Sequence, residues 1–217
     1  MAFRPFDPDI IKYRVTFTSK LKTLYNVSEI FYNKGENKTE RRNGTMYITE
    51  KTLTLSPKPL TALNAFLNRG GERFCFFDIE TTGLSAKVSS LYLIGVLWCE
   101  GDTGTVHTRQ WFADDYTSET DILTAFHDFL SDFTTLVHYN GSGFDIPYIE
   151  KKCRELGLPS PFGHINSLDI FREIRGLKSL FGTDNLKLFT VEKLVGFMRK
   201  DILTGKDCIQ VGRNRPP

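Results

Sequence analysis

Hydrophobic and polar positions follow clear periodicities in the later part of this 217-residue chain, from about residue 73 onward. Residues 74–79 are almost all apolar, which is typical of a central strand buried on both faces. Residues 92–98 and 107–112 predict two more strands, and the turn-forming residues 101–104 between them predict a hairpin. This part of the chain therefore begins with three consecutive strands.

Helical spacing starts after Ser118 and alternates with strand-like runs from there on. Ser118 and Asp121 have the spacing of a capping box, with an acid one carbon shorter than the usual Glu. A strand is predicted over 135–139, a helix over 144–156 and a final strand over 164–170. Apolar residues share one face of the first predicted helix: Ile122, Leu123, Phe126, Phe129 and Leu130.

A last amphipathic helix is predicted from Leu188 to Met198. Three strands followed by alternating helices and strands indicate a mixed sheet with helices on its faces. The predicted fold class is α/β.

The sequence pattern of residues 1–71 differs from that of the rest of the chain. It predicts a small β-rich N-terminal extension or accessory module, ahead of a main domain over 72–217. The polar stretch 34–44 predicts an exposed loop, and Asn43-Gly44 within it is a hairpin-type turn signal. A short helix is predicted over 60–67. Three runs are strand-like, namely 13–17, 46–49 and 52–55.

Composition narrows the class of protein without identifying a partner. The formal net charge of +2 gives no strong nucleic-acid signal by itself, because acidic ligands can mask a local basic surface in the sum. The four cysteines are widely spaced with no C-x-x-C, which argues against a zinc site or a disulfide framework. No run reaches the roughly 20 apolar residues of a membrane span, and no signal segment begins the chain. A reduced, cytoplasmic protein is expected.

Candidate chemistry is concentrated where the strand at 74–79 ends. Asp78 and Glu80 are two residues apart, so in a strand they project from the same face, opposite Phe77 and Ile79. Adjacent carboxylates repel each other unless a positive charge lies between them, and a divalent metal ion supplies that charge. The pair therefore predicts half of a metal site.

A similar arrangement follows the strand at 135–139. Asn140-Gly141-Ser142-Gly143 predicts a tight loop, and Asp145 begins the next helix. Ligands of α/β proteins bind in loops beyond the ends of strands. An acid in the first helical turn also complements the helix dipole, so Asp145 alone fits a structural role too.

The segments Asp78-Ile79-Glu80-Thr81-Thr82-Gly83-Leu84 and Asn140-Gly141-Ser142-Gly143-Phe144-Asp145 resemble the first two motifs of the DEDD 3′–5′ exonucleases. That family has the ribonuclease-H-like fold. The YprB-type bacterial branch is the most similar, and residues 91–95, 109–112 and 186–192 also resemble it. The resemblance runs from about residue 73 to about residue 210.

The resemblance implies that Asp78, Glu80 and Asp145 are catalytic residues and ligands of two divalent ions, Mg²⁺ or Mn²⁺. Two such ions about 4 Å apart activate water and stabilise the leaving oxygen. The implied substrates are the 3′ ends of single-stranded DNA or RNA. Three positions match those that contact the terminal nucleotide, and two more are expected near its sugar or base: Thr82, Gly83 and Leu84, then Asn140 and Phe144.

Several of these positions also have plain structural interpretations. Gly83 would let backbone approach the substrate and Leu84 would wedge against a base, but Thr82-Gly83 also fits a simple turn. Asn140 and Phe144 fit loop capping and core packing equally well.

The chain departs from the family pattern in its fourth acid. The family carries this acid on a late helix, four or five residues after a Tyr or His that positions the attacking water. Only His164 and Asp169 have that spacing, and they fall in a predicted strand, where the family has a different Asp. The chain is therefore expected to be truncated or altered at its C-terminus, with impaired catalysis.

Three functions remain open from the sequence. The first is a metal-dependent 3′–5′ exonuclease. The second is a non-catalytic nucleic-acid-binding module that keeps the fold but lacks the fourth acid. The third is an unrelated metal-dependent phosphatase or nucleotide hydrolase.

Overall fold

The computed structural model of the protein describes residues 38–43, 46–54, 73–99, 105–113, 115, 117–194, 208–209 and 213. The strand expected at 13–17 and the short helix expected at 60–67 lie outside the described residues. No helix within the described ranges is long and apolar enough to cross a membrane.

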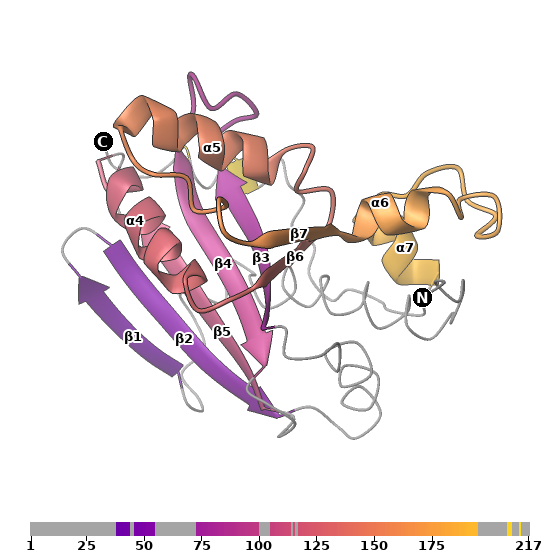
Figure 1. Cartoon of the computed structure of the whole chain (residues 1–217), viewed down its shortest axis with the longest axis horizontal. Coiled ribbons are helices and arrows are strands. Elements are labelled where there is room, and N and C mark those ends of the chain that lie inside the picture. The colour runs from indigo at the N-terminus through magenta and orange to yellow at the C-terminus, as the bar shows by residue number, and fades with distance from the viewer. Residues whose placement is uncertain are drawn as a thin grey trace.

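Seven strands form one mixed sheet in the order β1-β2-β5-β4-β3-β6-β7 (Figure 1). Neighbours from β1 through β3 pair antiparallel, whereas β6 runs parallel to both β3 and β7. The predicted mixed α/β sheet is thereby confirmed. The strands are β1 (Lys38–Asn43), β2 (Met46–Thr54), β3 (Phe74–Thr81), β4 (Leu91–Cys99), β5 (Thr105–Ala113), β6 (Thr135–His138) and β7 (Asn166–Asp169).

Two separate apolar clusters lie on opposite faces of the sheet, and Figure 1 shows helices lying across one of these faces. On one face lie α4 (Glu119–Leu130) and α5 (Asp145–Leu156), which pack on the first cluster. The second cluster, on the other face, includes residues of α6 (Ile170–Arg175) and α7 (Leu188–Leu194). We call these the α4/α5 face and the α6/α7 face. Helix α6 falls directly after the predicted last strand and was not itself predicted.

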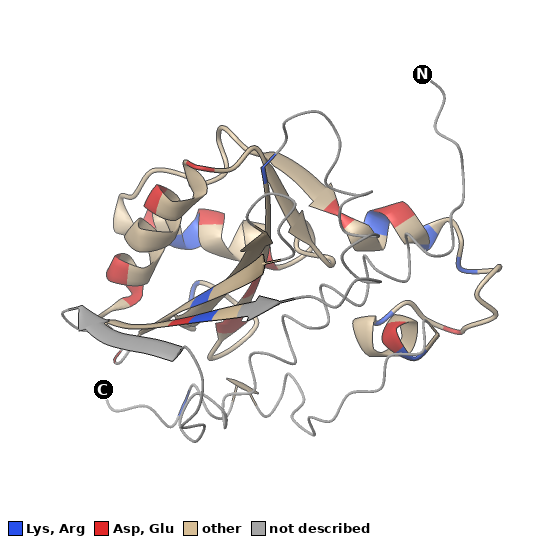
Figure 2. Ribbon diagram, turned by 90° about the horizontal axis from the view of Figure 1, so that it is seen from below, with Lys and Arg blue, Asp and Glu red and all other residues tan. Residues whose placement is uncertain are grey.

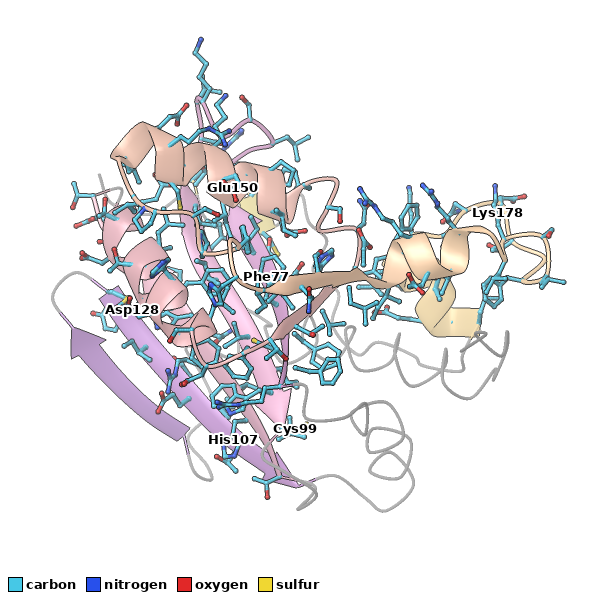
Figure 3. The ribbon with its side chains drawn as sticks, in the orientation of Figure 1. Phe77, Cys99, His107, Asp128, Glu150 and Lys178 are labelled. Carbon is cyan, nitrogen blue, oxygen red and sulfur yellow. The ribbon has the colours of Figure 1, made fainter. Side chains whose placement is uncertain are left out.

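Strand β3 contributes to both clusters, as its unbroken apolar run predicts. Phe77 and Ile79 belong to the α4/α5 face, and Phe74 and Phe76 to the α6/α7 face. Phe77 lies between the sheet and the helices (Figure 3), with its ring stacked 5.7 Å from that of Phe126 on α4. The strand is thus fixed from both sides, and its C-terminal end is held in place.

The structure differs from the sequence-based expectation around residues 34–55. Residues 38–43 form strand β1 rather than an exposed loop, and 46–54 form one continuous strand rather than two. The register pairs Asn43 with Met46, as the hairpin signal at Asn43-Gly44 predicts. Strand β1 lies at one edge of the described sheet, and edge strands are commonly polar in sequence.

Strand β2 pairs with β5 along its whole length, so residues 46–54 extend the same sheet as the later strands. An ion pair joins the middle of β2 to β5, where the Glu50 carboxylate lies 2.6 Å from Nε of Arg109. The Arg109 guanidinium also lies over the rings of Trp98, Trp111 and Phe129. The boundary between residues 71 and 72 stays a prediction.

The start of α4 uses a different device from the predicted capping box. Ser118 makes no side-chain cap, because its hydroxyl donates to the Asp115 carboxylate at 2.7 Å. The first residue of the helix, Glu119, instead accepts from the backbone N–H of Leu91 and lies 3.1 Å from the ammonium of Lys152 on α5. A single buried carboxylate therefore joins α4, α5 and β4.

The four cysteines are free thiols. Cys75 and Cys153 are buried, as predicted for small core residues. Burial raises the pKa of the Cys153 thiol to about 11, so it stays protonated at neutral pH. These side chains act as packing groups.

Candidate active site

Asp78 and Glu80 lie at the C-terminal end of β3 on the α6/α7 face. Both are half-buried, whereas Phe77 and Ile79 between and beside them are buried on the α4/α5 face. Asp78 pairs with Gly95 and Glu80 with Leu93 on β4, and a register shift follows at Glu80/Thr81. The predicted pairing of the two carboxylates on one face is confirmed.

The loop over residues 82–90 continues from this strand and is closed by backbone and side-chain bonds. The N–H of Thr82 donates to Ser90 O, and Ser90 N–H donates to the Thr82 hydroxyl oxygen, both at 2.9 Å. The Gly83 carbonyl accepts from the Thr81 hydroxyl at 2.8 Å. These bonds fit the structural interpretation of Thr82-Gly83 as a turn. Beyond it, Leu84 is 78% exposed at the surface.

The 82–90 loop is also tied to α5 and to the end of the chain. The Ser89 hydroxyl lies 2.8 Å from the hydroxyl of Tyr148 on α5. From the other side, Nε of Arg213 donates to Thr82 O at 2.9 Å. The Arg213 contact was missed by sequence reasoning, which noted only that the C-terminal tail is basic.

The loop between β6 and α5 is held in one conformation by its buried neighbours. Asn140 has a φ of 61°, in the left-handed region, and its N–H donates to the Asp169 carboxylate at 2.8 Å. The N–H of Gly141 donates to Nδ1 of His138 at 3.0 Å. A Cβ on Gly141 would lie 2.8 Å from the His138 ring, so this position requires glycine. The Asn140 side chain itself remains exposed.

Asp169 is a structural acid of this loop. Its carboxylate is buried and also accepts from the N–H groups of Ser142 at 3.3 Å and Phe171 at 3.1 Å, so that it caps α6. His164 lies elsewhere, with Nε2 3.1 Å from Leu130 O. The spacing of His164 and Asp169 therefore does not bring their side chains together as a water-positioning pair.

His138 is neutral in this network. Its Nδ1 accepts from Gly141, so the proton is on Nε2, which donates to the Ser167 hydroxyl at 2.7 Å. Burial lowers the pKa of His138 to about 4, a shift that the nearby Asp169 carboxylate opposes and Arg172 reinforces. At neutral pH the ring thus acts as a fixed acceptor for the β6–α5 loop.

Asp145 begins α5 and is buried on the same stripe as Tyr148 and Ile149. Tyr148 and Ile149 pack on the α4/α5 face, whereas Asp78 and Glu80 project from the other face of the sheet. Phe144 is half-buried, with its ring 5.5 Å from that of Tyr148. The packing interpretation of Phe144 is thus supported.

The carboxylates suit a hard divalent ion by their donor chemistry, but their grouping is incomplete. Within the described part of the chain, no three His, Cys, Asp or Glu side chains form a group that could hold a metal ion. Asp78 and Glu80 are brought together, and Asp145 is not grouped with them. The described residues alone therefore do not fit a three-ligand centre.

The remaining surface gives no simple electrostatic signal. Figure 2 shows acidic and basic residues interspersed over the described ribbon, in keeping with the formal net charge of +2. An open pocket of about 520 Å³ is formed by residues between Gly176 and Asp184. It includes Lys178, which lies at the far end of the molecule from the sheet (Figure 3), and none of the predicted site residues.

Comparison with known proteins places this architecture in a family. Residues 75–213, more than half of the chain, match the RNase H superfamily. The chain belongs to the RNase H superfamily. The resemblance to exonucleases of ribonuclease-H-like fold is thus confirmed at the level of the superfamily, and the YprB-type branch stays a prediction. No curated protein sequence matches this superfamily member.

Solved structures with a similar fold include a family B DNA polymerase from the hyperthermophilic archaeon Pyrobaculum calidifontis. The TM-score is 0.50 at 19% identity, over 66% of this chain and 21% of the polymerase chain. A product-bound exonuclease I is similar with a TM-score of 0.48 at 13% identity, over 65% of this chain and 42% of that one. For E. coli exonuclease I in complex with a dT13 oligonucleotide, the TM-score is 0.47 at 13% identity, over 66% and 41%. This RNase H superfamily member thus spans less than half of each of these proteins.

Proposed function

We propose that this protein is a metal-dependent 3′–5′ exonuclease that hydrolyses phosphodiesters at single-stranded DNA or RNA ends. The observation that carries the proposal is the placement of Asp78 and Glu80 on one face at the end of β3, in a chain of the RNase H superfamily. Strand β6 runs parallel to β3, so the loop that leads to Asp145 leaves the same edge of the sheet. The YprB-type branch is the proposed subfamily.

The proposal includes Mg²⁺ or Mn²⁺, with two ions implied by the family resemblance. Asp78 and Glu80 are the proposed first ligands and Asp145 the third. Because the described residues do not group all three acids, we expect weak ion binding to the free protein and tighter binding when a substrate phosphate adds its oxygens.

The 82–90 loop and the β6–α5 loop are the proposed contacts for the terminal nucleotide. Leu84 supports this role best, because a large apolar side chain that is 78% exposed can pack against a base. Thr82, Gly83, Asn140 and Phe144 are proposed to lie around the same end. The hydrogen bonds that hold these two loops would keep the contacts in a fixed arrangement.

Digestion of a 3′-labelled oligonucleotide with Mn²⁺ tests the proposal, with wild type compared with Asp78→Ala. Asp128→Ala is the matched control, since Asp128 is an exposed carboxylate on α4. We expect label release by wild type and Asp128→Ala, and almost none by Asp78→Ala. Absence of metal-dependent release by wild type would contradict the nuclease proposal, and release of phosphate from mononucleotides alone would favour a phosphatase.

A second candidate is a non-catalytic module that binds nucleic-acid ends. It is favoured by the absence of a three-ligand group among the described residues. Fluorescence anisotropy with an end-labelled oligonucleotide separates the two candidates. Binding without any label release, with or without Mn²⁺, would support the module.

A further inference from the structure

Gln110 on β5 lies in the same cross-strand row as Asp78. Asp78 pairs with Gly95 on β4, and Gly95 pairs with Gln110 on β5. Directly paired residues project from the same face of a sheet, so Asp78 and Gln110 share the α6/α7 face. Gly95 between them contributes no side chain, and a glycine inside a strand often marks a place where a ligand comes close to the backbone.

The Gln110 side chain is buried but incompletely bonded. The residue is 6% exposed, and its buried amide Nε2 has no hydrogen-bond partner among the residues that the structure describes. The adjacent residues of β5 cannot accept from this amide. Arg109 and Trp111 project from the opposite face of the sheet, where Arg109 pairs with Glu50. An amide donor of this kind destabilises the fold unless a ligand or another group accepts from it.

We propose that Gln110 is a substrate-positioning residue, whose amide donates to a sugar or phosphate oxygen of the terminal nucleotide bound beside Asp78. This inference rests on the proposed function and adds a residue that neither acid motif contains. A neutral amide suits this place, since it can donate to the nucleotide without competing as an anion with Asp78 and Glu80 for cations.

The test compares Gln110→Met with a matched control, Thr135→Val. Met has a similar shape and no polar atom, so the substitution removes the unpartnered amide without opening a cavity. Thr135 on β6 is also buried, and its hydroxyl has no hydrogen-bond partner within the described part of the chain; it pairs with Phe74, four residues before Asp78. Both variants therefore remove an unpaired buried polar group, and only Gln110→Met does so in the row of Asp78.

Binding is measured by anisotropy with a cleavage-resistant phosphorothioate oligonucleotide in Mn²⁺, and thermal unfolding is measured beside it. Gln110→Met is expected to weaken binding by about tenfold, the usual weight of one hydrogen bond, with an unchanged or raised Tm. In cleavage assays, KM is expected to rise more than kcat falls. Thr135→Val is expected to bind as wild type does.

Two oligonucleotides distinguish the source of the accepting oxygen, one ending in a 3′-hydroxyl and one in a 3′-phosphate. If Gln110→Met weakens binding only of the oligonucleotide with a 3′-hydroxyl, the accepting oxygen belongs to the terminal sugar. If it weakens binding of both oligonucleotides, the accepting oxygen belongs to a phosphodiester. Wild-type affinity in Gln110→Met, or a lowered Tm with unchanged affinity, would overturn the inference while leaving the proposed function intact. If wild type binds neither oligonucleotide, both proposals fail.

Discussion

The two faces of the sheet have very different contents. The α4/α5 face is lined by aromatic rings, with Phe77 stacked on Phe126, and Phe126 6.1 Å from Trp111. The α6/α7 face carries apolar residues at one end of β3, then Asp78, Glu80 and the buried amide of Gln110. One face therefore supplies mainly packing energy, while the other leaves polar groups where apolar ones would pack better. A loss of packing stability of this kind is expected at a functional site.

The largest expected effect is on stability, from a cavity in the aromatic face. Phe126→Ala should lower the free energy of unfolding by about 3–5 kcal/mol, because a fully buried ring is lost. Thr124→Ala, at an exposed position of the same helix, should change it by less than about 0.5 kcal/mol. Urea denaturation measures both, and equal effects would break the contrast between the two positions.

The next effect is on activity alone. Asp78→Asn keeps the size of the side chain and removes its charge, and we expect cleavage to fall by more than the roughly 10–100-fold typical of groups outside the ligand shell. The Tm should stay close to that of wild type, since removing a carboxylate from beside Glu80 relieves repulsion. A large drop in Tm with cleavage retained would assign Asp78 to stability.

A pH effect is expected from His138, which links the two parallel strands to the loop before α5. Its folded pKa of about 4 lies below the ordinary value of 6.5, so the unfolded chain binds the proton first as the pH falls. Stability is therefore complete above pH 6.5 and is lost towards pH 4, by up to about 3 kcal/mol. In His138→Asn this part of the pH dependence should disappear, and an unchanged pH profile would contradict the assignment.

The smallest effect is expected at the loop surface. Leu84→Ser should weaken oligonucleotide binding by about 3–10-fold, since stacking against one base contributes roughly 1–3 kcal/mol where it is complete. Val88→Ser is the control, because Val88 is 81% exposed on the same loop and was not predicted to contact the substrate. Anisotropy titrations compare the two variants, and equal losses would show that the loop acts as a general apolar surface.

Local periodicity explains most of what could be predicted from the sequence. The two-residue period of a strand over 74–80 was enough to place Asp78 and Glu80 on one face, and the apolar spacing after Ser118 was enough to predict α4. The prediction was less accurate at 38–43, where a polar stretch became an edge strand. Edge strands need few apolar residues, so the pattern there resembles that of a loop.

The sequence by itself determined the acid pair, the mixed α/β architecture and the two loops that follow parallel strands. These depend on spacings of a few residues, which the strand and helix periods convert directly into faces. Only the tertiary structure decided that Asp169 binds backbone N–H groups, that Arg213 reaches Thr82, and that Gln110 shares a row with Asp78. These contacts join residues far apart in the chain, and cross-strand register is set by the packing of the whole sheet.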